Sequence, residues 1–242
     1  MNSAKFIHLE EINSTNDYAK KHISELEDLT VIYADRQISG RGRLDRKWID
    51  TGEDNLFLTI IVKPSEDLTT VYQNFTQYLC VILCMLLEEE YYLSPKIKWP
   101  NDVLINGKKI AGILSEGTTK GDKFLGLALG IGVNLNTSKD NLAKIDKPAT
   151  SLLVETGEKI DKKLFLEKLY SKFCLLYDRF VCEGFPYIKN EYLSRFVFLG
   201  KNLTINVLGE LHNGVAEGIT EDGSLILNEN NNMKTYYIGD IL

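Results

Sequence analysis

The fold is decided by a stretch that begins Val103-Leu104-Ile105-Asn106-Gly107-Lys108-Lys109-Ile110 and continues through Ala111-Gly112-Ile113-Leu114-Ser115-Glu116. Apolar residues flank its Asn-Gly pair, which is the strongest short-range signal for a β-hairpin with a type I′ turn. A second turn at Lys120-Gly121-Asp122 leads into another apolar segment, 124–136. Three β elements without intervening helices predict an antiparallel meander. Together with helical segments elsewhere, they predict an α+β fold with a mixed or antiparallel sheet.

Further strands and helices are expected before and after this meander. Runs rich in β-branched and aromatic residues predict strands, and apolar residues at helical spacing predict helices. The segment 55–62 is almost entirely apolar, which predicts a central strand covered on both faces and ended by Pro64. The other expected strands are 6–9, 29–34 and 96–99; the expected helices are 14–26, 70–90, a short one opening at 149–152, 161–183 and 186–195.

From Phe198 onward the pattern changes to short strands separated by turns. The expected strands are 203–207, 214–220, 225–228 and 234–238. A module this small rarely buries enough apolar surface to fold alone, so it should pack against the rest of the chain. We therefore predict a main domain at 1–195 and a small C-terminal β-barrel at 196–242.

Composition excludes several classes of protein. The sequence contains no run of 18 apolar residues and no signal-peptide core, which predicts a cytoplasmic protein without a membrane partner. The four cysteines form no CxxC pair; Cys80 and Cys84 lie one helical turn apart on an apolar helix, which favours buried free thiols over a metal site. The formal net charge of −6 argues against a nucleic-acid coat protein.

A basic loop interrupts this acidic chain. Between Arg36 and Lys47 there are five cations and one anion, a net charge of +4. Gly40 and Gly42 flank Arg41, so the backbone there can come close to a ligand. A loop that is costly to order and cationic is suited to closing over an anion. The simpler interpretation, a solvated basic surface loop, is equally open on this segment alone.

The sequence Ser14-Thr15-Asn16-Asp17 marks the start of a helix. Ser14 is a good N-cap, and Asp17 three residues later completes a capping-box-like pattern. Capping alone explains these residues. A helix N-terminus with free N–H groups and hydroxyls also suits a polar ligand, so both interpretations stand.

Standard catalytic signatures are absent: there is no P-loop, no dinucleotide fingerprint, no HExxH and no GxSxG. Some polar residues outside the expected helices instead form a chemically consistent set: Arg41, Arg43, Lys98, Asp102, Lys109 and Asn134. Cations, a carboxylate able to hold Mg²⁺ and an amide suit chemistry at a nucleoside triphosphate. Adenylation of a carboxylate needs no protein nucleophile, because positioning and charge neutralisation do most of the work. Taken singly, Lys109 beside an Asn-Gly turn or Asp102 after Pro-Asn is an ordinary surface residue.

Over essentially its full length, the sequence resembles the biotin protein ligases. The resemblance is carried by Ser14-Thr15-Asn16, Gln37 with Gly40-Arg41-Gly42-Arg43 and Arg46-Lys47-Trp48, Lys98-Trp99-Pro100-Asn101-Asp102, Lys109-Ile110-Ala111-Gly112-Ile113-Leu114, and Gly130-Ile131-Gly132-Val133-Asn134. It implies a class II synthetase-like catalytic domain with a mixed sheet and a C-terminal SH3-like barrel. It also implies a reaction in which biotin and ATP give biotinyl-5′-AMP and pyrophosphate, followed by transfer of biotin to a lysine of a biotin carboxyl carrier domain.

The resemblance further implies roles for individual residues. It assigns Lys109, Arg41 and Arg43 to catalysis, and Asp102 to placing Mg²⁺. The biotin-binding set that it implies is Ser14, Thr15, Asn16, Gln37, Gly40, Arg41, Gly42, Arg43 and Lys109. The nucleotide-binding set that it implies is Arg46, Trp48, Asn101, Asp102, Lys109 and Asn134. Lys108 competes with Lys109, and the match to Ile110-Ala111-Gly112 selects Lys109.

Some features depart from the family pattern or leave alternatives. Leu44-Asp45 stands where relatives often have Arg-Gly, which bears on closure of the loop rather than on the reaction. Ser14-Thr15-Asn16 begins almost at the N-terminus, so we expect no winged-helix domain and no specific DNA binding. Exposed strand edges permit a homodimer. The alternatives are a lipoate or octanoate transferase on a similar fold, and a biotin-binding protein without turnover.

Overall fold

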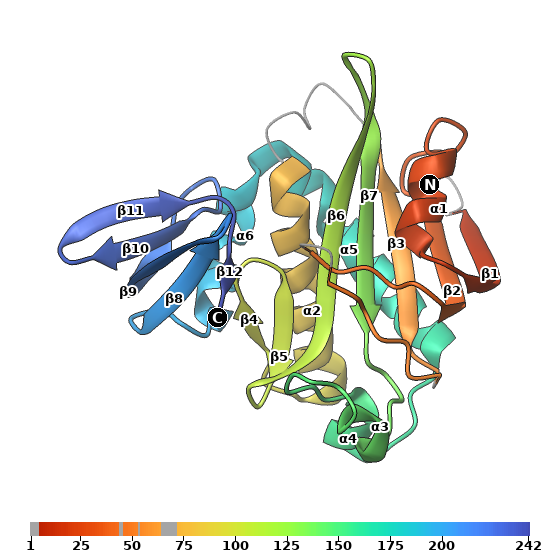
Figure 1. The fold of residues 1–242 in the computed structure, drawn as a ribbon. Helices are drawn as coiled ribbons and strands as arrows, with labels where there is room; N and C mark the ends of the chain where they lie inside the picture. Colours follow the sequence, from red (N-terminus) through yellow and green to blue (C-terminus); the bar gives the residue numbers. More distant parts are fainter. Residues whose placement is uncertain (1–4, 44–45, 53, 64–71) are drawn as a thin grey trace.

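A seven-stranded mixed sheet forms the main body of the protein (Figure 1). The computed structural model describes residues 5–43, 46–52, 54–63 and 72–242. Strand order is β1-β2-β3-β7-β6-β5-β4; β1 and β2 pair in parallel and the other neighbours are antiparallel. The strands are β1 (Phe6–Ile12), β2 (Val31–Gln37), β3 (Leu56–Val62), β4 (Lys96–Lys98), β5 (Asp102–Ile105), β6 (Lys108–Lys120) and β7 (Lys123–Val133).

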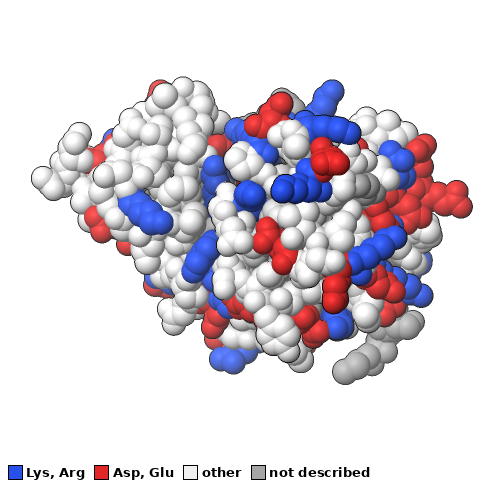
Figure 2. Space-filling model, turned by 90° about the horizontal axis from the view of Figure 1, so that it is seen from below, with Lys and Arg blue, Asp and Glu red and all other residues white. Residues whose placement is uncertain are grey.

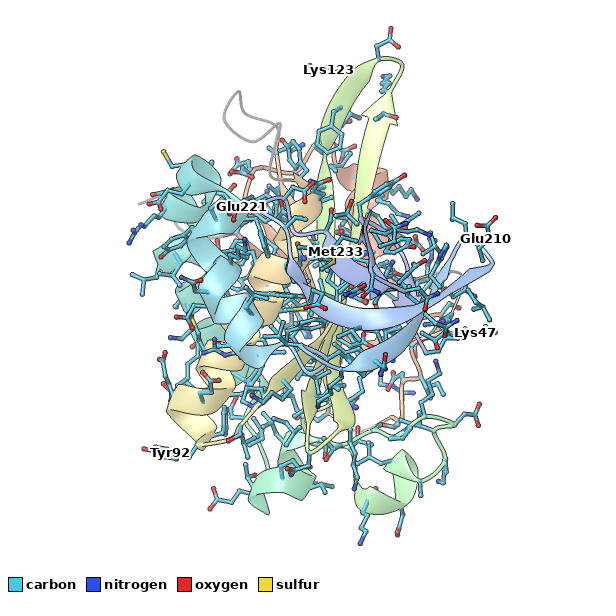
Figure 3. All side chains as sticks on the ribbon, turned by 90° about the vertical axis from the view of Figure 1, so that its left-hand side faces the viewer. Lys47, Tyr92, Lys123, Glu210, Glu221 and Met233 are labelled. Atoms are coloured by element: carbon cyan, nitrogen blue, oxygen red, sulfur yellow. The ribbon has the colours of Figure 1, made fainter. Side chains whose placement is uncertain are left out.

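The predicted meander is confirmed as β5, β6 and β7. Asn106 and Gly107, between β5 and β6, have φ values of 50° and 75°, as a type I′ turn requires. The long β6–β7 hairpin extends beyond the neighbouring strands, with Lys123 at its tip (Figures 1 and 3). All seven residues of β3 are buried, and β3 pairs with β2 and β7, as its apolar sequence predicts.

Helices cover the two faces of the sheet unequally. One face carries the main core, formed with η2 (Tyr72–Asn74), α2 (Phe75–Tyr91), α5 (Lys162–Glu183) and α6 (Phe185–Arg195). The other face carries α1 (Thr15–His22), whose Ala19 packs in a small cluster with Ile32 and Ile61. The short helices α3 (Lys139–Leu142) and α4 (Leu152–Thr156) lie at one end of the sheet (Figure 1).

The helix boundaries differ from the predictions in two places. The helix expected at 14–26 ends at His22; Ile23 and Leu26 are still buried, but through a turn. The helix expected from 70 begins at Phe75 after a 3₁₀ turn, and residues 64–71, including the expected break at Pro64, lie outside the described residues. Asp161 caps α5 and Gly184 ends it, as expected.

The C-terminal module is an antiparallel five-stranded sheet. Its strands are β8 (Asn202–Val207), β9 (Glu210–Ile219), β10 (Leu225–Glu229), β11 (Asn232–Tyr236) and β12 (Asp240–Ile241), in the order β11-β10-β9-β8-β12. Within the described ranges β11 and β12 are not paired with each other, so this sheet is not closed into the expected barrel. The physical reason is the length of β12: it has only two residues, so the edge that does not pair with β8 is too short to form a ladder with β11.

One tight turn joins this module to the main body. Gly223, between β9 and β10, has a φ of +85°, and its carbonyl accepts hydrogen bonds from Gln77 Nε2 (2.8 Å) and Trp99 Nε1 (3.1 Å). A side chain at Gly223 would lie 2.4 Å from Gln77 Oε1, so only glycine fits. Asn74 adds a hydrogen bond to the carbonyl of Asp222 (2.9 Å).

In the part of the chain described here, no helix has the length and apolar character needed to cross a bilayer.

Candidate active site

The start of α1 forms a buried polar network. Ser14 caps the helix, and its hydroxyl accepts from the Asp17 N–H, so the capping interpretation is confirmed. Gln37 Oε1 accepts from both the N–H (2.8 Å) and the hydroxyl (3.1 Å) of Thr15. The Thr59 hydroxyl lies 2.9 Å from that of Thr15 and 2.7 Å from Asn16 Oδ1. These bonds hold the side chains rigidly in place.

A small cavity opens above this network. Its volume is about 30 Å³, and it is lined by Ser14, Thr15, Asn16, Gln37, Arg41, Trp48, Gly112, Leu114, Gly130, Ile131 and Gly132. Five of the residues expected to bind biotin therefore share one cavity: Ser14, Thr15, Asn16, Gln37 and Arg41. Gly40, Gly42, Arg43 and Lys109 do not line it directly.

Glycines form the floor of the site. Gly112 of β6 and Gly132 of β7 are paired directly across the two strands. The indole ring of Trp48 lies on them: a Cβ at Gly132 would be 2.7 Å from Trp48 Cε2, and one at Gly112 would be 3.1 Å from Cζ3. A Cβ at Gly130 would be 2.2 Å from Asn16 Oδ1. The glycines of these two motifs therefore provide a surface that a flat ring can approach closely.

Lys109 borders the same ring. Its Nζ lies 5.4 Å from the centroid of the Trp48 ring and 2.6 Å from Asp102 Oδ1. Absence of a side chain at Gly112 makes room for the ammonium group, because a Cβ there would be 2.8 Å from Nζ. Lys108, the competing lysine, is exposed. Lys109 thus lies next to Trp48, a residue that lines the same cavity as Arg41.

The basic loop is folded as a short hairpin. Gly42 N–H donates to Arg46 O (2.7 Å), Trp48 N–H donates to Gly40 O (2.9 Å), and Arg41 bridges to Lys47. Leu44 and Asp45, where the sequence departs from the family pattern, lie outside the described residues. The loop therefore has an ordered base that brings its arginines towards the sheet.

Carboxylates hold the base of the loop on the side of α1. Arg41 Nη1 lies 2.8 Å from Asp17 Oδ1, and its Nη2 lies 3.4 Å from Glu116 Oε1. Glu116 also accepts from Asn16 Nδ2 (2.9 Å) and Lys20 Nζ (2.7 Å). Glu116 thus links the loop to the polar network of α1, a role that the sequence analysis missed.

Arg43 and Arg46 point instead towards the C-terminal module. Arg43 Nη1 lies 3.3 Å from both Asn101 Oδ1 and Asp240 Oδ1, and Arg46 Nη2 lies 2.8 Å from Asp240 Oδ2. Burial lowers the pKa of Arg43, and the Asp240 and Asp102 carboxylates oppose that shift. Burial also lowers the pKa of Lys98, again opposed by Asp102 and Asp240. A cluster of partly desolvated cations results, which is a setting for phosphate groups.

Asn134 has a structural task in the folded chain. It is buried, and its Nδ2 donates to the Thr150 carbonyl (3.0 Å). Its backbone N–H donates to Ile110 O, and Thr150 N–H donates to Lys109 O. The segment around Thr150 is thereby fixed beside Lys109. Contact between Asn134 and a nucleotide stays a prediction.

A larger cavity of about 230 Å³ lies between the main body and the C-terminal module. Arg43, Gln77, Trp99, Ser115 and Tyr237 are among the residues that line it. Charged side chains of both signs are interspersed on the face of the molecule seen in Figure 2. Ion pairs of Arg41 with Asp17 and of Arg46 with Asp240 partly balance the positive charge of the basic loop.

The sequence predicts buried free thiols at Cys80 and Cys84, and this prediction is confirmed. Cys80 and Cys84 are buried free thiols, and burial raises the pKa of both. Among the described residues, no group of three or more His, Cys, Asp or Glu side chains could hold a metal ion. A resident metal held by protein ligands alone therefore does not fit the described site.

The fold and the site together define a class of protein. The chain superposes on the biotin protein ligase of Aquifex aeolicus in complex with biotin and ATP with a TM-score of 0.84 and 27% identity, covering 98% of this chain and 97% of that one. Residues 9–134 match the biotin/lipoate A/B protein ligase family, and residues 198–242 match the biotin protein ligase C-terminal domain. The chain belongs to the biotin/lipoate A/B protein ligase family, so the resemblance stated from the sequence is confirmed.

Two curated relatives give the same result. The biotin–[acetyl-CoA-carboxylase] ligase of Paracoccus denitrificans is 34% identical over 218 residues, covering 89% of this chain and 90% of that protein. The bifunctional ligase/repressor BirA of Bacillus subtilis is 33% identical over 213 residues, which are 88% of this chain. The chain matches only 65% of the length of that BirA protein.

Proposed function

We propose that this protein is a biotin protein ligase. It activates biotin with ATP to biotinyl-5′-AMP and pyrophosphate, and then transfers biotin to a lysine of a carboxyl carrier domain. The observation that carries this proposal is the cavity between α1 and the glycine floor, with Arg41 on its wall and Lys109 beyond Trp48. Family membership and the likeness to the Aquifex aeolicus ligase support it.

In the first step, a carboxylate oxygen of biotin attacks the α-phosphorus of ATP, and the bond to the bridging oxygen of pyrophosphate breaks. Ser14, Thr15, Asn16 and Gln37 would bind the polar end of biotin, because they line the inner cavity. Gly40, Arg41, Gly42 and Arg43 would close the loop over the acyl-phosphate. Lys109 would neutralise charge where the carboxylate meets the α-phosphoryl group.

The nucleotide would occupy the other side of Lys109. Arg46, Asn101 and Asn134 would contact it, and the Trp48 ring would be the surface for adenine. At about 30 Å³ the inner cavity holds little more than a water molecule, so side chains on its wall, Trp48 among them, would have to rearrange to admit biotin.

A magnesium ion fits this arrangement if the substrate supplies most of its ligands. Mg²⁺ is commonly held by one or two carboxylates together with phosphate oxygens and waters. Asp102 is partly exposed, and its carboxylate lies beside Lys109, so it would supply the protein ligand. When bound, the ion would neutralise charge on the phosphates.

In the second step, the amine of an acceptor lysine attacks the acyl carbon of the adenylate, and AMP leaves. The division of the chain follows these tasks: residues 1–195 would hold both substrates, and residues 196–242 would support the loop and the acceptor. We further propose that the protein acts in the cytoplasm, binds no specific DNA, and pairs through sheet edges if it forms a homodimer.

The test is pyrophosphate release from ATP with biotin, lipoate or octanoate as the only acid. We expect release with biotin and none above background with the other two. Transfer is checked by mass spectrometry of a carboxyl carrier domain, which should gain one biotinyl group on one lysine. Turnover with lipoate but not biotin would favour the lipoate transferase, and binding of biotin without turnover would favour the non-enzymatic alternative.

A further inference from the structure

Asp240 is a buried carboxylate that does not belong to the motifs of the site. It is one of the two residues of β12, and it is 7% exposed. Its oxygens lie 3.3 Å from Arg43 Nη1 and 2.8 Å from Arg46 Nη2. Both arginines belong to the basic loop, whereas Asp240 comes from the C-terminal module. One carboxylate of the small sheet thus contacts two cations of the basic loop.

The backbone around Asp240 is tightly fixed. Asp240 and Ile241 pair with Asn206 and Ile205 of β8, and the N–H of the following residue donates to Thr204 O (3.0 Å). The preceding residue, Gly239, has a φ of +146°, and a Cβ there would be 2.5 Å from Ile205 Cδ1. The small sheet therefore fixes the backbone of Asp240, and the two arginines reach its carboxylate from the basic loop.

The contacts leave both guanidinium groups able to bind a ligand. Asp240 is paired with only one terminal nitrogen of each arginine, and a guanidinium carries five N–H donors. Arg43 Nη1 also contacts Asn101 Oδ1 (3.3 Å). Among the described residues, Arg43 Nη2 and Arg46 Nη1 make no ion pair with a carboxylate, so they could meet phosphate oxygens. Without the carboxylate, two neighbouring cations would repel each other, and both would be partly desolvated. This geometry favours a support for the arginines over a blockade of the site.

We propose that Asp240 is a positioning residue: it holds Arg43 and Arg46 so that N–H groups not engaged by the carboxylate face the phosphates of ATP. The inference rests on the proposed ligase function and deepens it. It gives the C-terminal module a specific task, which is to set the position of the nucleotide-binding half of the basic loop. Asp240 itself touches neither substrate, so its removal should affect ATP far more than biotin.

The test is a set of KM values from biotin-dependent pyrophosphate release, with ATP and biotin varied in turn. Asp240→Asn should raise the KM for ATP about five- to tenfold, while the KM for biotin changes by less than about twofold. Asp240→Glu, which keeps the charge, should recover most of the loss. The matched control is Glu210→Gln, which removes the same charge from the same sheet. The Glu210 side chain is 86% exposed at the outer end of the β8–β9 hairpin (Figure 3), and this variant should equal wild type.

Dependence on the arginines separates positioning from a general structural effect. In an Arg43→Gln, Arg46→Gln background, Asp240→Asn should add no further rise in the KM for ATP. Trypsin provides a readout without substrate, because it cleaves after the arginines of the loop. Loop cleavage should be faster in Asp240→Asn than in wild type or Glu210→Gln. If Asp240→Asn does not melt like wild type, Asp240→Ser replaces it under the same criteria.

The outcomes distinguish the two proposals. A wild-type protein without biotin-dependent pyrophosphate release would refute the ligase function, whatever the variants do. An active wild type with unchanged ATP KM and loop cleavage in Asp240→Asn would refute the positioning role alone. An undiminished effect of Asp240→Asn in the double-arginine background, or an equal effect of Glu210→Gln, would also refute it.

Discussion

Lys109 Nζ lies 2.6 Å from Asp102 Oδ1, so the proposed catalytic ammonium is paired with a carboxylate of the neighbouring strand. Both groups are partly exposed, with 33% and 22% of their side-chain surfaces accessible. The pair is thus accessible to a substrate. An anionic substrate can take the place of Asp102 at the ammonium, while Asp102 turns towards other ligands.

Replacing Lys109 by alanine should lower the rate of adenylate formation about 100-fold, because a positioned charge at the reacting oxygens is lost. The fold should persist, because the side chain is partly exposed. Pyrophosphate release and the thermal melting curve measure the two effects. Lys108→Ala is the matched control, since Lys108 is the adjacent, exposed residue of β6, and it should behave as wild type. Equal rates for the two variants would remove Lys109 from the mechanism.

Ligand binding should change the fluorescence of Trp48 and leave that of Trp99 unchanged. The chain contains only these two tryptophans. Trp48 lines the small cavity and lies on the glycine floor, whereas Trp99 is buried and hydrogen-bonded to Gly223 O. Titration with biotin and ATP should therefore alter the emission spectrum of wild type but not of Trp48→Phe. A full response in Trp48→Phe would show that the signal does not come from Trp48.

Gly223→Ala should weaken the joint between the main body and the C-terminal module. The new Cβ would lie 2.4 Å from Gln77 Oε1 at a positive φ, so we expect a loss of about 2–4 kcal/mol in the free energy of unfolding. Gly209→Ala is the control, because Gly209 also has a positive φ but has open space around it. That variant should lose only about 1 kcal/mol, from backbone strain. Urea denaturation compares the two, and similar losses would mean that the packing at Gly223 is adaptable.

The Lys162 ion pairs should contribute stability that disappears in acid. Lys162 Nζ lies 2.6 Å from Asp35 and 2.8 Å from Asp54. Burial alone would raise the pKa of Asp35, but hydrogen bonds from Lys162 and His8 outweigh it and lower the pKa below 3.8. Because the folded-state pKa of Asp35 is lowered, its contribution is present above about pH 4 and is lost as pH falls through the folded value.

Lys162→Met should therefore destabilise the protein by about 1 kcal/mol at pH 7 and by less below pH 3.8. Lys163→Met, a change at the adjacent exposed position, serves as the control and should have little effect at either pH. Denaturation curves at pH 7 and pH 3 provide the measurement. A loss that is equal at both pH values would indicate lost packing of the lysine stem rather than lost charge pairing.

Local signals explain why much of the fold was predictable from the sequence. The Asn106-Gly107 turn and the apolar run of β3 are specified by neighbouring residues, because turn chemistry and burial act over a few positions. The predicted end of α1 was wrong. Ile23 and Leu26 are buried although they lie in a turn, so their apolar pattern does not distinguish a turn from a continued helix. Closure of the barrel was also wrong, since it depends on the length of β12, which no local pattern sets.

The site was predictable where its residues lie in motifs. Ser14, Gln37 and Arg41 were expected to converge, and they line one cavity. The contacts of Glu116 and Asp240 with the basic loop were not predicted, because the arginines that they contact are distant in the sequence. An isolated acidic residue in a strand is indistinguishable from a solvated one until the fold brings an arginine to it. The position of Trp48 on Gly112 and Gly132 likewise depends on three separate segments.

The bond between Arg43 and Asp240 joins residues 197 positions apart. A ribosome makes the arginine early and its partner much later, whereas Arg41 of the same loop has partners, Asp17 and Glu116, in earlier parts of the chain. Under the proposed role of Asp240, nucleotide binding therefore reaches full strength only after the last strand of the small sheet has been made and has paired with β8.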